Sequence, residues 1–452
     1  MAKQDPRLLA VKVLVKVEEG ASASAALDEA LSGAELDARD RGFATELVDG
    51  TLRWLGRLEY RLAQVSDKPL EKLDAPVRAV LRMGAYQLTL LDRVPPHAAV
   101  DSSVKLARKL AHEGAAKFVN AVLRRLEREK DTLSFPDQAE DLVEYLAVVY
   151  SHPAWLVRRW LERYGLEETE ALLKIDNTPP PVTVRVNRRW MTREGLQTML
   201  QMHDIETEPT PISQWGLILP NRGNPREMDE FREGVFSVQG EGSMVMVELL
   251  RPGRNRKGWD LCAGVGGKTT HLAEWVDDSG SLLATDTSAD RLKVLAAEMS
   301  RLDLHTISVF HSDARTYPIE PETLDYALLD APCSGTGSLR RQADARWNKS
   351  LEQLPGLAVL QRELLEAAAR ALKPGGILLY CTCSLEPEEN EEVVDAFLAD
   401  HPEWAAEPAG EKLQNLPADA RLPSGYVRLL PHRHGTDGFF AARLVKQVAG
   451  GE

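Results

Sequence analysis

One stretch of this 452-residue sequence carries the pattern that decides its fold, Tyr326-Ala327-Leu328-Leu329-Asp330-Ala331-Pro332-Cys333-Ser334-Gly335-Thr336-Gly337. An apolar run stops abruptly at a carboxylate, and a thiol follows shortly after it. A second apolar run, Gly376–Tyr380, ends in Cys381-Thr382-Cys383-Ser384. Each run predicts a buried strand. Because chemistry in open α/β sheets lies at the carboxyl ends of strands, Asp330, Cys333 and Cys383 form a candidate reaction centre.

The composition is typical of a globular protein with several domains. The chain is too long for one ordinary core, so about two or three domains are expected. Its residues are 43% apolar and 27% charged. No apolar run approaches the roughly 20 residues that a membrane helix needs, and Met1–Pro6 lacks the apolar core of a signal peptide. We therefore expect a cytoplasmic protein with no membrane contact.

The four cysteines all lie in the C-terminal half, near predicted strand ends: Cys262, Cys333, Cys381 and Cys383. This clustering argues against a secreted disulfide framework and favours reduced thiols. Cys381 and Cys383 are too close together for a zinc knuckle, and no histidine pair follows them. No metal is therefore expected.

Charge is distributed unevenly along the chain, whose net charge is −14. Residues 1–135 hold 22 Lys and Arg against 20 Asp and Glu, a balance of +2, which leaves 33 against 49, or −16, for the rest. Local patches decide phosphate binding, so the acidic total does not exclude a nucleic-acid partner.

Three domains are predicted, at 1–135, 145–235 and 236–452. The first is all-α, because Asp5-Pro6 is a good helix start and apolar residues then recur at helical spacing up to Gly20. Further helical patterns cover Ser22–Leu31, Asp37–Ala63, Ala75–Leu91, Ala98–His112 and Ala115–Glu129. The second is a small α+β domain. In it the triple proline Pro179-Pro180-Pro181 forces extended backbone before the strand pattern Val182–Asn187, and Trp215–Leu219 is another candidate strand.

The third domain alternates strands and helices, which predicts a mostly parallel sheet covered on both faces. Its first strand ends in the glycine-rich turn Asp260-Leu261-Cys262-Ala263-Gly264-Val265-Gly266-Gly267-Lys268-Thr269. The spacing fits neither a Walker loop nor a dinucleotide-binding GxGxxG. The next strands end in Asp286, Asp313 and Asp330, each of which alone could be a helix cap. Together they suit a nucleoside cofactor without phosphate, which describes S-adenosylmethionine.

The order of these motifs resembles the RNA 5-methylcytosine methyltransferase family, and most closely its bacterial Sun/Fmu-type branch, which modifies 16S ribosomal RNA. Arg346-Trp347, Gln361 and Asp437–Ala442 fit the same family. In the N-terminal part, Arg39–Val48, Leu81–Leu88 and Lys117–Arg125 resemble the NusB-like RNA-binding domain that marks this branch. The chain departs from the family at Gly264-Val265, where Ala-Pro is usual.

The resemblance implies an α/β Rossmann-like S-adenosylmethionine methyltransferase domain with a mostly parallel sheet, preceded by an all-α NusB-like domain and a small α+β domain. Chemistry alone does not say which thiol attacks the cytosine ring. By resemblance Cys383 is the nucleophile, Cys333 assists product release and Asp330 holds the base and cofactor. The implied cofactor site comprises Cys262, Ala263, Gly264, Val265, Gly266, Gly267, Lys268, Asp286, Asp313 and Asp330.

The expected partner is 16S ribosomal RNA, alone or in its subunit, and the oligomeric state is open, with a monomer favoured. Candidate RNA contacts are the basic residues Arg39, Arg41, Arg124, Arg125, Arg340, Arg341 and Arg346. The competing interpretation is that these arginines only form solvated faces. Two other functions stay open at this point: a tRNA or DNA cytosine-C5 methyltransferase, and an inactive RNA-binding assembly factor.

Overall fold

The computed structural model describes residues 5–220 and 224–448. The chain divides into two compact units, Met1–Thr178 with Leu339–Lys349, and Pro179–Ser338 with Ser350–Glu452. Residues 145–178, which the sequence pattern assigned to the second of three domains, group with the N-terminal helices. The short segment Leu339–Lys349 also groups with them, although it lies within the predicted methyltransferase domain.

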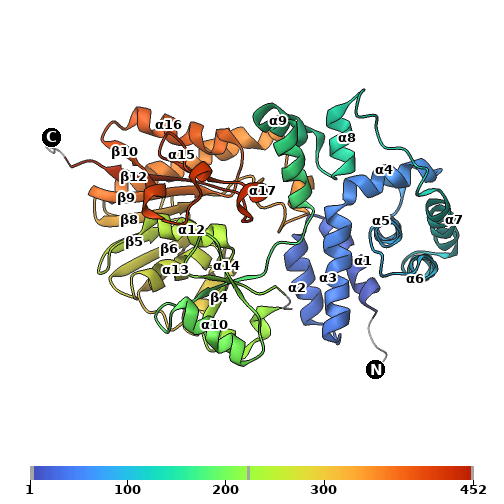
Figure 1. Cartoon of the computed structure of the whole chain (residues 1–452), viewed down its shortest axis with the longest axis horizontal. Coiled ribbons are helices and arrows are strands. Elements are labelled where there is room, and N and C mark those ends of the chain that lie inside the picture. Colours follow the sequence, from blue (N-terminus) through green and yellow to red (C-terminus); the bar gives the residue numbers. More distant parts are fainter. Residues whose placement is uncertain (1–4, 221–223, 449–452) are drawn as a thin grey trace. The chain divides into compact units, whose positions relative to one another are not determined.

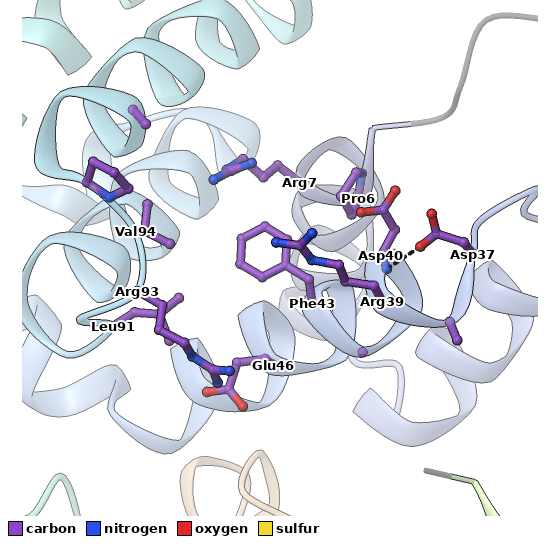
Figure 2. A pocket seen from close by; sticks show the side chains of 14 residues that line it. Pro6, Arg7, Asp37, Arg39, Asp40, Phe43, Glu46, Leu91, Arg93 and Val94 are labelled. Carbon is purple, nitrogen blue, oxygen red and sulfur yellow. Dashed lines mark hydrogen bonds between the residues drawn. The ribbon is translucent and has the colours of Figure 1, made fainter.

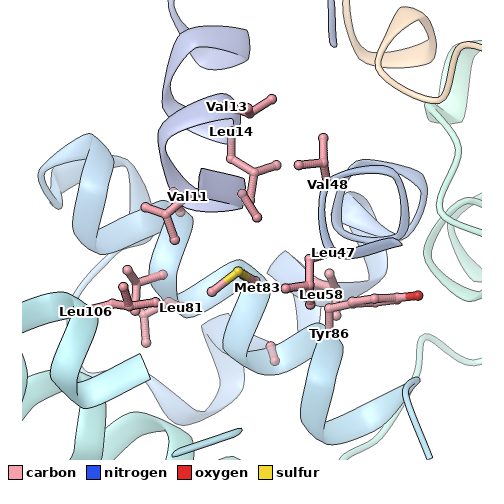
Figure 3. Close-up of a cluster of buried hydrophobic side chains, with 14 of the residues drawn as sticks. Val11, Val13, Leu14, Leu47, Val48, Leu58, Leu81, Met83, Tyr86 and Leu106 are labelled. Carbon is pink, nitrogen blue, oxygen red and sulfur yellow. The ribbon is translucent and has the colours of Figure 1, made fainter. Parts of the chain in front are cut away.

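The first unit is all-α, as predicted. Its helices are α1 (Pro6–Glu18), α2 (Ala23–Ser32), α3 (Ala38–Arg53), α4 (Leu55–Val65), α5 (Ala75–Thr89), α6 (Pro96–Leu110), α7 (Glu113–Glu129), α8 (Leu142–Val149) and α9 (Ala154–Asp176). The side chains of Asp5, Ser22 and Asp37 cap α1, α2 and α3 by accepting backbone N–H groups. The apolar faces of these helices meet in one core, part of which Figure 3 shows around Leu81 and Met83.

Helix α9 bends at Gly165, whose φ of 75° lies in the left-handed region that favours glycine. The segment Leu339–Lys349 holds a short 3₁₀ turn, Ala345–Trp347, and its Ala343 is part of the helical core.

The second unit begins with a small antiparallel sheet in the order β2-β3-β1-β4. Its strands are β1 (Thr183–Val186), β2 (Glu208–Pro209), β3 (Gly216–Ile218) and β4 (Phe236–Val238), accompanied by α10 (Arg193–Met202) and α11 (Asp229–Arg232). The strands predicted at 182–187 and 215–219 are β1 and β3. This confirms the small α+β part.

The main sheet of the second unit has the order β10-β12-β9-β8-β5-β6-β7, and β11 pairs with β12. Its strands are β5 (Lys257–Asp260), β6 (Ser281–Asp286), β7 (Ile307–His311), β8 (Leu324–Asp330), β9 (Leu372–Thr382), β10 (Trp404–Glu407), β11 (Val427–Leu429) and β12 (Phe439–Lys446). Strands β5 to β9 pair in parallel and β12 runs antiparallel to β9. The prediction of a mostly parallel sheet is therefore confirmed.

Helices cover both faces of this sheet (Figure 1). One face packs on α12 (Glu241–Leu250), α13 (Gly267–Trp275) and α14 (Ala289–Arg301), and the other on α15 (Leu354–Ala371) and α16 (Glu391–Asp400). A short helix, α17 (Pro431–His434), precedes β12. Side chains alternate along β8, since Tyr326 and Leu328 belong to one core and Ala327 and Leu329 to the other. Within the described residues, no helix has the length and apolarity needed to cross a membrane.

Candidate active site

Two strand ends bring the predicted thiols together. Strands β8 and β9 pair so that Asp330 lies beside Cys381, and the N–H of Ala331 donates to the carbonyl of Cys381 at 2.9 Å. The loop after Asp330 then crosses to the end of β9, where the N–H of Gly337 donates to the carbonyl of Cys383 at 2.8 Å. As a result the Sγ atoms of Cys333 and Cys383 are 3.4 Å apart.

The surroundings of the two thiols are electrostatically unequal. The hydrogen bond with Cys333 lowers the pKa of Cys383, and Lys268 and Ser338 act in the same direction, against burial and Asp330. The same hydrogen bond and burial raise the pKa of Cys333 well above its ordinary value. Cys383 therefore loses its proton more readily than Cys333, and the thiolate is the more reactive form of a cysteine.

Asp330 is held by two neighbours at the end of β8. The ammonium group of Lys268 donates to its Oδ2 at 2.6 Å, and the thiol of Cys381 lies 3.6 Å from its Oδ1. Burial acts to lower the pKa of Lys268, but Asp330 outweighs it and the pKa is raised. Burial raises the pKa of Cys381, so this thiol stays protonated and can donate to the carboxylate. The side chain of Asp330 is still 32% exposed.

The glycine-rich turn between β5 and α13 is fixed by Asp286. Its two carboxylate oxygens accept the N–H groups of Gly264 and Ser288, each at 2.8 Å. Gly264 and Gly266 have φ values of 56° and 90°, which few residues other than glycine adopt without strain. A Cβ on Gly264 would meet no atom within 4 Å, whereas one on Gly266 would lie 2.4 Å from Leu295 Cδ1. The turn is thus open beside Gly264 and closely packed beside Gly266.

A buried ion pair supports the same turn from β1. Arg185 and Glu274, each about 1% exposed, pair at 2.7 Å. Arg185 also donates to the carbonyl of Gly267 at 3.0 Å, where α13 begins. The sequence pattern did not predict this ion pair. Arg185 lies in an alternating strand pattern, at a position where a side chain facing solvent was expected.

The other predicted cofactor residues have mixed environments. Asp313 lies just after β7, and bonds from Arg315 lower its pKa. Burial raises the pKa of Cys262 well above its ordinary value, so this thiol is unreactive. Val265 is 53% exposed at the tip of the turn.

The sequence analysis missed Glu389, which is fully buried and bonds to the residues that follow the two thiols. It accepts hydrogen bonds from Ser334, Ser384 and Gln361. The available signal was the run Pro387-Glu388-Glu389-Asn390 soon after the second thiol motif. An acidic run of this kind ordinarily indicates a solvated turn.

The predicted RNA contacts of the first unit lie on several helices. Arg39 is exposed and borders a hollow of about 710 Å³, around which Figure 2 also shows Arg7 and Arg93. Arg41 donates to the carbonyls of Ala34 and Leu36. Arg124 and Arg125 form ion pairs with acidic neighbours on or near α7.

The three arginines predicted after the thiol loop do not share one environment. Arg341 is exposed and Arg340 donates to the carbonyl of Thr178 at 3.3 Å. Arg346 is only 1% exposed, and its guanidinium is surrounded by protein acceptors. Burial and these bonds turn the guanidinium toward the protein, which favours a structural role for Arg346, and its contact with RNA stays a prediction. Within the described ranges, no cluster of three or more His, Cys, Asp or Glu is placed to hold a metal ion.

Comparisons with known proteins match the whole chain. Residues 4–128 match the NusB family, residues 152–224 the ferredoxin-like domain of RsmF/B-like methyltransferases, and residues 247–445 the 16S rRNA methyltransferase RsmB/F. The probable ribosomal RNA small subunit methyltransferase B of Bacillus subtilis is 36% identical, over 99% of this chain and 100% of that protein. The ribosomal RNA small subunit methyltransferase B of Pseudomonas putida is also 36% identical, over 98% and 99%. The solved structure of PH0851 has a TM-score of 0.85 at 28% identity and covers 99% of this chain and 100% of that one.

Proposed function

Because the chain belongs to the 16S rRNA methyltransferase RsmB/F family, we propose that it methylates carbon 5 of a cytosine in 16S ribosomal RNA through a covalent Cys383–C6 adduct. As a member of this family it is an S-adenosylmethionine-dependent RNA methyltransferase. One observation carries the proposed mechanism: two thiols lie 3.4 Å apart at neighbouring strand ends, with the proton biased toward Cys333. A ribosomal RNA substrate implies a cytoplasmic site of action.

The thiol pair suits addition followed by elimination. The electron pair of the Cys383 thiolate forms the bond to C6, and carbon 5 becomes nucleophilic enough to take a methyl group. When water takes the C5 proton as a base, the electron pair of the C5–H bond forms the C5–C6 double bond again, and the S–C6 bond breaks. Negative charge then returns to Cys383, where the Cys333 thiol at 3.4 Å can donate a hydrogen bond to it. Cys333 thereby assists release of the methylated product.

We propose that Asp330 acts on the base. Lys268 and Cys381 hold its two oxygens from the protein side, so the carboxyl keeps one orientation beside the thiols. A fixed polar group next to N3 of the ring would steady the charge that develops there. The substrate cytosine has to be unpaired or flipped out, since a thiol cannot reach C6 within a stacked duplex.

The residues around the glycine-rich turn fit S-adenosylmethionine, which when bound supplies an electrophilic methyl group. The backbone is open beside Gly264 and the turn is fixed by Asp286. Asp286 suits the hydroxyls of a ribose and Asp313 an exocyclic amine. Lys268, at the end of this turn, donates to Asp330 at 2.6 Å and so joins the turn to the strand end that precedes Cys333.

The thiol variants test this proposal. With labelled cofactor and 16S RNA, Cys383→Ser is expected to abolish methylation. Cys333→Ala is expected to accumulate a covalent protein–RNA adduct, visible as a shifted band in denaturing gels. Cys381→Ser, which keeps a donor toward Asp330, serves as the matched control and should trap no adduct. Full turnover by Cys383→Ser would refute the assigned mechanism, and preferential labelling of tRNA or DNA would refute the substrate.

A further inference from the structure

Glu389 is a buried carboxylate that lies at the junction of the two thiol segments. Its exposed fraction is 0%. Oε1 accepts the N–H of Ser334 at 2.8 Å and the Gln361 amide at 3.1 Å, and Oε2 accepts the hydroxyls of Ser334 and Ser384. Within the part of the chain that the structure describes, no cationic side chain pairs with it. Only directed hydrogen bonds compensate its burial, which is costly for a charged group.

The donors are the residues next to the two thiols. Ser334 follows Cys333 and Ser384 follows Cys383, and their hydroxyls are also 3.0 Å apart. Gln361 donates in addition to the carbonyl of Pro332, the residue before Cys333, at 2.9 Å. The same carboxylate thus fixes the chain immediately beside both sulfur atoms.

Glu389 is itself held firmly by β9. The hydroxyl of Tyr380 donates to its backbone carbonyl at 2.5 Å. The next residue, Asn390, accepts from Thr382 at 2.5 Å and donates to the carbonyl of Ser384 at 2.9 Å. The carboxylate is therefore part of the same rigid strand end as Cys383, and it reaches across to the loop that carries Cys333.

We propose that Glu389 is the positioning residue that sets the distance between the Cys333 and Cys383 sulfur atoms, and with it which of the two carries the proton. The chemical consequence rests on the proposed methylation mechanism, but the geometric claim does not. Without the shared acceptor, the Cys333 loop loses two bonds, both from Ser334. Gln361, which holds Pro332 on the same loop, loses its bond to Glu389 as well. A small shift of the loop is enough to break a hydrogen bond between thiols.

Glu389→Gln is the sharpest variant because it keeps the shape of the side chain. The amide oxygen of the glutamine can still accept from Ser334 N and Gln361. Its NH₂ group, however, would face the hydroxyls of Ser334 and Ser384, which donate to Glu389 in the wild-type protein. Both hydroxyls would have to turn and become acceptors. Glu392→Gln, at an exposed carboxylate soon after it in the chain, is the matched control. Ser334→Ala and Ser384→Ala each remove one hydroxyl donor and serve if Glu389→Gln folds poorly.

A redox assay measures the distance without RNA or cofactor. Hydrogen peroxide oxidises two neighbouring thiols to a disulfide: both S–H bonds break, one S–S bond of about 2.05 Å forms, and peroxide takes up two electrons and becomes water. Peptide mass spectrometry identifies the Cys333–Cys383 disulfide. We expect rapid formation in the wild-type protein and in Glu392→Gln, and a rate lower by about tenfold in Glu389→Gln. An unchanged rate in folded Glu389→Gln overturns the inference.

A pH profile separates positioning from general loss of structure. The rate at which iodoacetamide alkylates Cys383 follows the thiolate fraction. If Glu389 maintains the bond from Cys333, Glu389→Gln shifts this profile to higher pH, while a variant that is only less stable keeps its midpoint. With active enzyme, kcat should fall about tenfold while KM for cofactor stays within about twofold. If the wild-type protein proves inactive on RNA but both thiol assays respond, the proposed function fails and the positioning role stands.

Discussion

The substitution Arg346→Ala tests the role of the segment Leu339–Lys349 in the first unit. The guanidinium of Arg346 donates to Asn177 Oδ1 at 2.9 Å and to the carbonyls of Ser151 and Asp176 at 3.0 and 3.1 Å. Longer bonds reach the carbonyls of Arg53 and Leu339, at 3.4 and 3.5 Å. Burial lowers its pKa to about 10, which shows how much solvation the cation has given up.

The three short bonds set the size of the effect. Hydrogen bonds to a charged group contribute about 1.5–3 kcal/mol each, and buried acceptors left without a donor cost a similar amount. Water entering the space recovers part of this loss. We therefore expect Arg346→Ala to lower the unfolding free energy of the first unit by about 3–5 kcal/mol, as when one partner of a buried charged network is removed.

Urea unfolding of the full chain measures this change in free energy. Hydrogen exchange of the backbone amides of α3 and α9 then shows whether the loss lies in the first unit, where the segment is bound. Arg341→Ala, at an exposed position of the same segment, is the control and should stay within about 0.5 kcal/mol of the wild type. Arg346→Ala could instead leave the unfolding free energy within about 1 kcal/mol of the wild type and weaken RNA binding as strongly as loss of a surface arginine would. That result would refute the structural role and support the predicted RNA contact.

Further substitutions test the second unit. Gly337→Ala places a Cβ 2.5 Å from the carbonyl oxygen of Gly438, so the loop after Cys333 has to move. Methylation assays should then show kcat lower by about tenfold or more, while calorimetry should show that cofactor affinity is retained. Arg185→Met leaves the carboxylate of Glu274 buried without its cation, and urea denaturation should show a loss of about 3–5 kcal/mol. Burial raises the pKa of Asp260 to about 7. Between the ordinary pKa of an aspartate and pH 7, the folded state therefore holds a proton that the unfolded state releases. The stability of the wild-type protein falls as the pH rises through this window. Asp260→Asn lacks that loss, so its stability relative to wild type should rise between pH 4 and pH 8 by up to about 4 kcal/mol; a constant difference would contradict the assignment.

Sequence patterns located the two strands that carry the thiols because each contains an apolar run followed by polar residues. The strand pattern around Tyr326–Asp330 corresponds to β8, and Gly376–Tyr380 lies within β9. The helices of the first unit were visible for a similar reason, since caps and helical spacing are local signals. Strand β12 was not predicted, because its first six residues are all buried and show no alternation of polar and apolar side chains.

The sequence did not predict that Arg346 and Glu389 are buried, because most of their contacts are non-local. Arg346 lies in a basic stretch that reads as a solvated loop, and only the fold shows that this stretch joins the core of the first unit. Glu389 lies in an acidic run with the same appearance. In both cases most of the partners are dozens of residues or more away along the chain. Residue type alone predicts exposure for any charged side chain.

The choice between the two thiols shows what the structure adds to the motifs. Both cysteines follow a strand end, and chemistry alone allows either of them to attack. Their surroundings are unequal. The hydrogen bond between the thiols, Lys268 and Ser338 lower the pKa of Cys383 against burial and Asp330. The same hydrogen bond, burial, Glu389 and Asp330 all raise the pKa of Cys333. Glu389 raises the pKa of Cys333 and also accepts the N–H of Ser334 in the loop that carries Cys333. The position of that loop and the proton preference of the thiols are therefore linked through Glu389. This inequality supports the proposal that Cys383 attacks, and the Cys383→Ser and Cys333→Ala variants test it.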